Sequence, residues 1–176
     1  MKRGIAMIHG AEVLNKFLAF RDNYVLLLGM DEGLLNVPMQ EGKWSIVDTV
    51  NHLLGWDQYL LHSVLPDIRT GNQVSFPDHD IFNRQSTESI AGVSAHDVLS
   101  AAIQLREELV NQVNNLTDDL RSKPVTVNEN SHCPHTQEAY TLLYLIGEFV
   151  EHDWHHQKQI DAYLSRSAHV AKGNGA

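Results

Sequence analysis

Four long segments of this chain repeat apolar residues every three or four positions, and this pattern constrains the fold more than any other feature. The segments are residues 11–29, 45–65, 94–116 and 136–164. Such spacing places apolar side chains on one face of an α-helix, whereas β-strands require an alternation that is absent here. We therefore expect an all-α protein in which four amphipathic helices form an up-down-type four-helix bundle.

Serine residues and a proline mark the expected helix ends. Ser45 and Asp48 have the spacing of a capping box at the start of the second helix, with aspartate in place of the usual glutamate. Pro66 should end that helix, because proline restricts the residue before it to extended backbone. Ser94, followed three positions later by Asp97, should begin the third helix.

The connection between the second and third helices, residues 66–93, is long for a compact domain. Connections of more than about 12–15 residues are uncommon and often functional. We expect this segment to form either a wall or lid of a pocket or a solvated connection that contains a short helix. Residues 125–127, Val-Thr-Val, could add a brief extended piece before the fourth helix.

Length and composition fit a single globular domain, expected over residues 1–165 with a flexible tail at residues 166–176. The chain carries 22 acidic against 13 basic residues, and its net charge of −9 argues against nucleic-acid or anionic-membrane partners. A single cysteine and the absence of an apolar secretory core favour a cytoplasmic location. The longest apolar stretch, residues 140–150, is far too short to span a bilayer.

Two of the eleven histidines lie on the apolar face of the fourth helix, one turn apart. His152 and His156 fall on the stripe that also holds Leu145, Phe149 and Tyr163. An i, i+4 pair can direct two imidazole nitrogens at one metal ion. A metal would also relieve the cost of burying unpaired imidazoles, about 1–3 kcal/mol each. The alternative is a pair of core histidines that hydrogen-bond to their neighbours.

A third ligand would come from another helix, and His52 in the second helix is a candidate. It lies on the flank of that helix's apolar stripe, where it could line a pocket or face solvent, and helical geometry leaves both open. Asp57 lies within the stripe, where an unpaired carboxylate is costly. It could hydrogen-bond a ligand histidine or pair with Arg21 of the first helix.

Other groups of residues give weaker evidence for a functional site. The segment 131–135, Ser-His-Cys-Pro-His, contains metal-binding residue types but no second cysteine pair, so we interpret it as a solvated turn. Trp44, Trp56 and Trp154 are interpreted as packing residues. The sequence contains no glycine-rich phosphate loop, nucleophile elbow or His-Glu-x-x-His motif.

Two groups of residues resemble the signatures of a known family. Residues 43–45 (Lys-Trp-Ser) and 52–57 (His-Leu-Leu-Gly-Trp-Asp) resemble the helix-two signature of the DinB/YfiT-like superfamily. Residues 152–156 (His-Asp-Trp-His-His) and 159–160 (Gln-Ile) resemble its helix-four signature. The resemblance covers about residues 11–164, nearly the whole chain.

The resemblance implies a four-helix bundle, and many members of this superfamily bind one divalent metal ion through three histidines. Carried over by motif, these ligands are His52, His152 and His156. The chain departs from the family at residues 157–158, Gln-Lys, where many members have Arg-Gly. This departure affects what can be inferred about the rim of the pocket, not the ligands. The family includes low-molecular-weight-thiol S-transferases, a thiol-dependent isomerase and many members without known activity.

These observations favour a metal-dependent enzyme of the hydrolase or thiol S-transferase type. Three histidines leave a fourth position on the ion for water or a small thiol, which would act on a small-molecule substrate. Zinc suits three imidazoles best, while nickel, iron and manganese also bind them. Asp57 and Gln159 would support the ligand histidines. The alternative is a non-catalytic stress-response or ligand-binding bundle with a structural metal. The resemblance also suggests a homodimer.

Overall fold

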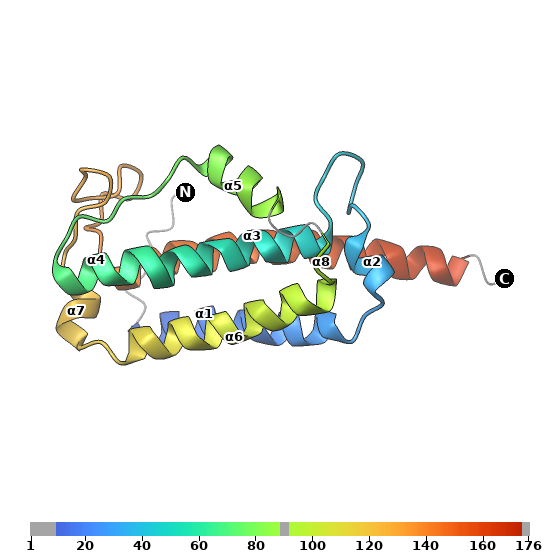
Figure 1. The fold of residues 1–176 in the computed structure, drawn as a ribbon, viewed down its shortest axis with the longest axis horizontal. Coiled ribbons are helices and arrows are strands. Elements are labelled where there is room, and N and C mark those ends of the chain that lie inside the picture. The colour runs from blue at the N-terminus through green and yellow to red at the C-terminus, as the bar shows by residue number, and fades with distance from the viewer. Residues whose placement is uncertain (1–9, 89–91, 174–176) are drawn as a thin grey trace.

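The four periodic segments fold into the four long helices of a bundle (Figure 1). The computed structural model describes residues 10–88 and 92–173, so the first residues of the predicted domain and the last of the predicted tail lie outside it. The long helices are α1 (Gly10–Leu28), α3 (Ile46–Tyr59), α6 (Ala95–Asn114) and α8 (Leu142–Gly173). Shorter pieces are α2 (Glu32–Asn36), the π-helix η1 (Leu60–Val64), α4 (Leu65–Thr70), α5 (His79–Glu88) and α7 (Asp118–Ser122). The described residues form isolated β-bridges and no strand, which confirms the all-α prediction.

The helices are not arranged in a simple up-down order. α1 packs against α6 and α8, and α3 packs against α6, so the consecutive helices α1 and α3 lie on a diagonal. In Figure 1, α1 and α8 run in one direction and α3 and α6 in the other. This order arises because the connection after α4 returns the chain to the end of the bundle where α3 begins. There, the backbone N–H of His96 at the start of α6 donates to Glu32 of α2, 3.3 Å away.

Two predicted helix starts are confirmed at atomic detail. The Ser45 hydroxyl accepts from the backbone N–H of Asp48, and the Asp48 carboxylate accepts from the backbone N–H of Ser45, which completes a capping box. The side chain of Ser94 accepts from the backbone N–H of Asp97. Each cap satisfies N–H groups that a helix end leaves without an intrahelical partner.

The prediction that Pro66 ends the second helix is wrong. The helical path continues through Pro66 to Thr70, where Gly71 in the left-handed conformation (φ +75°) terminates it. Just before the proline, the helix widens into the π-turn η1, and the N–H of Leu65 donates to the carbonyl of Leu60. Proline lacks an N–H and crowds the preceding turn, so the wider turn lets the helix pass it without a break.

The predicted limits of the fourth helix are also wrong. α8 begins at Leu142, because residues 131–139 form a turn in which the N–H of Cys133 donates to the carbonyl of Glu138. The helix then continues to Gly173, well past the predicted end near Leu164, so most of the predicted tail is helical. Although α8 is long, neither it nor any other described helix is apolar enough over its length to cross a membrane.

The interior consists of two apolar clusters with a buried polar layer between them. One cluster joins the first half of α1 to η1, α4, the end of α6 and the start of α8. The other joins the second half of α1 to α3, the start of α6 and Ile160 of α8. In sequence, three buried charged residues fall between the two clusters on their respective helices: Asp57, Arg106 and Asp153. The polar layer therefore lies at mid-height in the bundle.

Arg106 is the centre of this polar layer and is fully buried. Its Nε donates to Asp57 Oδ2 at 2.6 Å, and its Nη1 donates to Asp153 Oδ2 at 2.8 Å and to the Phe17 carbonyl at 2.8 Å. Burial would lower the pKa of the guanidinium, but the two carboxylates outweigh burial and raise it, so Arg106 stays charged. Burial also raises the pKa of Asp57 from 3.8 to about 6, against the attraction of Arg106. One side chain thus links all four long helices.

Replacing Arg106 with leucine should strongly destabilise the protein, because Asp57 and Asp153 would then be buried without their cation. We expect the free energy of unfolding to fall by about 3–5 kcal/mol in chemical denaturation. Arg106→Lys, which keeps the charge but not the forked geometry, should lose less. The control is Arg21→Leu, since Arg21 pairs with Asp22 and Glu107 at the surface and should cost under about 1 kcal/mol. Equal losses for the two leucine variants would contradict this account.

Candidate metal centre

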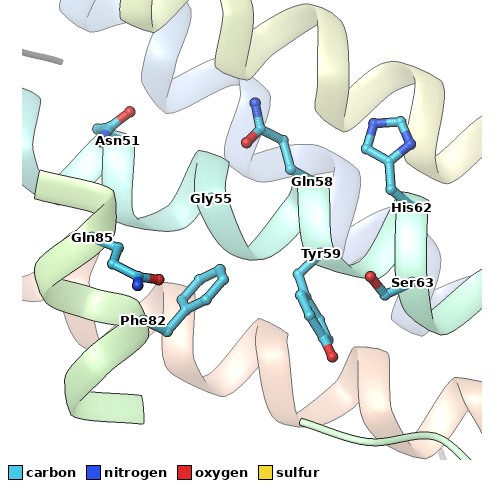
Figure 2. Close-up of a pocket in the computed structure, with 8 residues that line it drawn as sticks. All are labelled: Asn51, Gly55, Gln58, Tyr59, His62, Ser63, Phe82 and Gln85. Carbon is cyan, nitrogen blue, oxygen red and sulfur yellow. The ribbon is translucent and has the colours of Figure 1, made fainter. Parts of the chain in front are cut away.

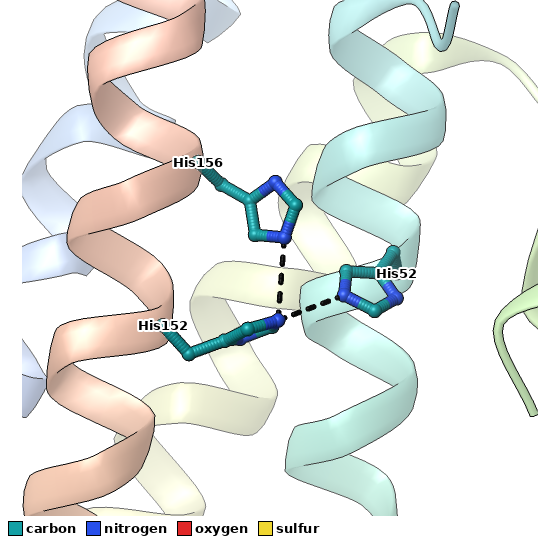
Figure 3. Close-up of side chains that lie close together, drawn as sticks. All are labelled: His52, His152 and His156. Atoms are coloured by element: carbon teal, nitrogen blue, oxygen red, sulfur yellow. Dashed lines mark hydrogen bonds between the residues drawn. The ribbon is translucent and has the colours of Figure 1, made fainter. Parts of the chain in front are cut away.

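Three histidine side chains from two helices converge on one point, as Figure 3 shows. His52 comes from α3, and His152 and His156 come from successive turns of α8. The Nε2 atom of His152 lies 3.1 Å from Nε2 of His52 and 3.2 Å from Nε2 of His156. The structure therefore brings together all three residues predicted as metal ligands.

This geometry fits a divalent cation better than hydrogen bonds alone. Nitrogens bound tetrahedrally to zinc at about 2.0–2.1 Å lie about 3.3–3.4 Å from one another, close to the separations seen here. His152 Nε2 can carry only one proton, so it can donate a hydrogen bond to only one of the two neighbouring atoms, Nε2 of His52 and Nε2 of His156. In the described part of the chain, the buried Nδ1 atoms of His52 and His152 have no hydrogen-bond partner. A cation is the one partner that all three Nε2 lone pairs can share.

The surroundings of the cluster keep two of its imidazoles, those of His52 and His156, neutral. Burial lowers the pKa of His52 from 6.5 to about 3, and repulsion from His152 and His156 adds to the effect. Burial also lowers the pKa of His156 from 6.5 to about 4, with His152 as the next cause. Neutral imidazoles have free lone pairs, and metal binding requires those lone pairs.

His52 faces the interior, which settles the question that helical geometry left open. Its side chain is 2% exposed. The ring of Trp44, on the loop before α3, lies 5.0 Å from the His52 ring and 6.2 Å from that of His156. Trp56 meets His52 edge to face at 6.4 Å. Trp44 and Trp56 thus pack, as predicted, but they pack directly on the histidine cluster.

Two side chains contact the cluster from outside. Gln159 Oε1 lies 3.2 Å from His156 Nδ1, so the residue predicted to support a ligand histidine is in contact with one of the three histidines. Asp153 Oδ1 approaches His152 Nδ1 at 3.7 Å. The exposed His155 contacts Gln159 and is not part of the cluster.

Asp57 has neither of the two partners predicted for it, a ligand histidine or Arg21. Its carboxylate accepts from Arg106 and not from a ligand histidine, while Arg21 is engaged with Asp22 and Glu107. Sequence reasoning missed Arg106, although its position on the apolar stripe of its helix was a signal. The carboxylate nearest a histidine of the cluster belongs instead to Asp153.

A cavity of about 350 Å³ reaches the cluster at His52 and His152. Its walls are largely aromatic, and they come from α3, α5, α8 and the loops around residues 76 and 128. Trp56 packs against Phe82 of α5, with ring centroids 4.1 Å apart. Residues 66–93 were predicted to wall a pocket or to contain a short helix, and the described part of this segment does both.

The structure contains two further cavities. One, of about 740 Å³, reaches His156 and Gln159 from the side of the loop that carries Trp44. The other, of about 410 Å³, lies between α3 and α5 and is drawn in Figure 2. None of the three clustered histidines lines the cavity of Figure 2, and its walls carry no carboxylate, lysine or arginine. The centre is therefore reached from two sides, and α5 separates the aromatic cavity from the one in Figure 2.

The segment 131–135 is not simply a solvated turn. Cys133 is buried, at 6% exposure, although its neighbours are exposed. Burial raises the pKa of its thiol, but hydrogen bonds from Tyr144 and from the Thr136 and His135 backbone outweigh burial and lower the pKa from 9.0 to about 7. No residue of this segment joins the three histidines.

The pKa shifts predict how the stability of the metal-free protein depends on pH. Between about pH 6.5 and pH 4, the unfolded chain protonates His52 and His156 while the folded chain does not, because its pKa values are about 3 and about 4. Acid therefore favours unfolding, and each histidine contributes a slope of up to about 1.4 kcal/mol per pH unit.

The measurement is the free energy of unfolding of chelated wild type and of His156→Gln at pH 7 and at pH 4.5. The variant should lose less stability on acidification, because glutamine does not titrate. Asp57, whose raised pKa acts in the opposite direction, is present in both proteins and cancels in the difference. Parallel pH profiles for the two proteins would contradict the prediction.

Solved structures share this fold. YfiT from Bacillus subtilis, described as a probable metal-dependent hydrolase with an unusual four-helix bundle topology, has a TM-score of 0.64 at 16% identity, over 96% of this chain and 93% of its own. A Streptococcus pneumoniae protein has a TM-score of 0.70 at 13% identity, over 91% of this chain and 92% of its own. An uncharacterized protein from Clostridium difficile 630 has a TM-score of 0.70 at 15% identity, over 91% and 98%.

No curated protein matches the sequence. The family model of the DinB superfamily matches residues 17–160, which include His52, His152 and His156 and all four long helices in whole or in part. The family and the fold that the sequence motifs suggested are thereby confirmed. This chain belongs to the DinB superfamily.

Proposed function

We propose that this protein is a metal-dependent enzyme that acts on a small molecule at the three-histidine centre. The observation that carries the proposal is the convergence of three Nε2 atoms without a fourth protein ligand among the described histidines, cysteines and carboxylates. Structural zinc sites are usually closed by four protein ligands, whereas catalytic sites keep one position open. The cavities on either side of the cluster give that position access to solvent and substrate.

His52, His152 and His156 would hold the ion, and zinc is the metal that we expect for this donor set, with nickel, iron(II) and manganese next. The bound cation would supply a Lewis acid that lowers the pKa of a water or thiol ligand. The chain's own contribution is to keep the imidazoles of His52 and His156 neutral, to orient His156 through Gln159, and to limit water around His52 by means of Trp44 and Trp56.

The aromatic cavity would receive the apolar part of the substrate. Trp56, Phe76 and Phe149 lie within 6.2 Å of one another, measured between ring centroids, and form a continuous apolar wall beside His52 and His152. Such walls bind apolar groups, while a few polar residues fix orientation. Here the polar residues on the wall include His79 and Glu148.

The nucleophile is either water or a low-molecular-weight thiol. The description of YfiT as a probable metal-dependent hydrolase supports water, and the superfamily's S-transferases support a thiol. A scaffold with a structural metal is the second candidate function. The position of the histidine cluster between two helices favours this scaffold function. The function also requires that the bound ion activates neither water nor a thiol.

Metal content is the first test. Recombinant protein purified without nickel affinity resin should contain close to one divalent metal ion per chain, determined by elemental analysis. His152→Ala and His156→Ala should abolish metal binding, and His52→Ala should weaken it strongly, because two nitrogens hold zinc far less tightly than three. The matched control is His155→Ala on the same helix, which should keep its metal. Unchanged metal content in all four variants would refute the assignment.

Catalysis is the second test. Holo and chelated protein are incubated with activated esters and amides, and separately with electrophiles plus a panel of small thiols. Turnover should require the metal, should fall to background in His156→Ala, and should decrease in acid. Turnover that survives chelation would exclude a metal mechanism. An intact metal site without turnover in either assay would favour the scaffold.

A further inference from the structure

The two cavities beside the metal centre differ in charge. Glu148 lines the aromatic cavity, which has no lysine or arginine in its walls. The larger cavity, of about 740 Å³, is lined by three cationic side chains and by no carboxylate. These cations are Lys43, Lys158 and Arg166. We call this larger cavity the basic cavity.

The basic cavity is unusual for this chain. Acidic residues outnumber basic ones by 22 to 13, and the net charge is −9. Elsewhere on the surface, Lys16 pairs with Glu12, and Arg121 pairs with Asp118. Within the described residues, none of the three cations of the basic cavity forms an ion pair. Like charges gathered without counter-charges repel one another, and an anionic ligand would relieve this repulsion.

The cations come from two elements that face each other across the cavity. Lys158 and Arg166 lie on α8, with Ala162 between them at i, i+4 spacing, and the short alanine side chain leaves room above the helix. Lys43 lies on the opposite loop and directly precedes Trp44, whose ring stacks on that of His156. The inner end of the cavity therefore reaches the metal centre at His156, and its cations extend from beside that end outward along α8.

We infer that the basic cavity binds a small molecule that carries two or more carboxylate or phosphate groups, with its other end directed at His156. This inference rests on the proposed function only in assigning the ligand's inner end to the metal centre. Lys43 and Lys158 lie near that end, and Arg166 lies about 15 Å farther along α8 than His156 at 1.5 Å per residue. An extended polyanion matches this distribution, and a volume of this size is typical of small-molecule sites.

Calorimetric titration with pyrophosphate and with propane-1,2,3-tricarboxylate tests the inference. Both the protein as purified and the chelated protein are used, and the uncharged triethyl ester of the tricarboxylate is the control ligand. Wild type should bind at least one of the anions and not the ester, with affinity that falls as salt is added. Tighter binding of pyrophosphate would indicate a phosphate ligand, and tighter binding of the tricarboxylate would indicate a carboxylate ligand.

Variants locate the site. Lys43→Gln, Lys158→Gln and Arg166→Gln should each weaken anion binding by about tenfold, the loss expected for a charge-assisted hydrogen bond, while the metal content stays unchanged. Lys123→Gln removes the same charge at an exposed position outside the basic cavity and should have no effect. Equal affinities for the triple variant and Lys123→Gln, or no anion binding by wild type at millimolar concentration, would overturn the inference. Anion binding that persists in chelated protein would support this site even if the metal centre proved non-catalytic.

Discussion

The guanidinium of Arg106 lies between two buried carboxylates, Asp57 on α3 and Asp153 on α8, and these two helices carry all three clustered histidines. Asp153 directly follows His152, and Asp57 lies little more than one turn after His52. A sliding of either helix would break an ion pair in an environment without water to replace it. A buried charge without its partner costs several kcal/mol, so the ion pairs that hold the bundle together also set the register of the three clustered histidines.

The same layer explains why the centre can be both buried and polar. Two apolar clusters close the bundle above and below it, and within the layer the main charged groups satisfy one another. The histidines are then held on helices, which position ligands more rigidly than loops do. Burial lowers the pKa values of His52 and His156 well below 7 and keeps these two imidazoles neutral, and the Nε2 atoms of all three histidines are directed at a common point. A shared cation would offset the cost of burying the imidazoles of His52 and His156 beside the half-buried His152.

The sequence predicted the parts of this site that depend on local periodicity. His152 and His156 follow from a 3.6-residue repeat on one helix, and the cap at Ser45 follows from a spacing of three residues. The burial of His52 could not be predicted in this way, because it depends on tertiary contacts of its ring with Trp44 of the preceding loop and with His152 and His156 of α8. The family resemblance, and not helical geometry, predicted His52 as a ligand.

Other features were missed for physical reasons that can be named. A proline normally ends a helix, but the π-turn before Pro66 accommodates it. Apolar spacing alone does not distinguish the turn at residues 131–139 from the first turns of α8. Arg106 lies on an apolar stripe, where a charge is usually excluded, and it is accepted there because two carboxylates from other helices meet it.

The most direct test of the account is the coordination sphere of the metal-loaded protein, determined from a crystal structure with anomalous data at the metal edge. The account predicts one ion bound to Nε2 of His52, His152 and His156 at about 2.0–2.1 Å, with a non-protein ligand in the remaining position. An ion bound elsewhere, or a fourth side chain that closes the site, would contradict the claim that this centre is an open, reactive one.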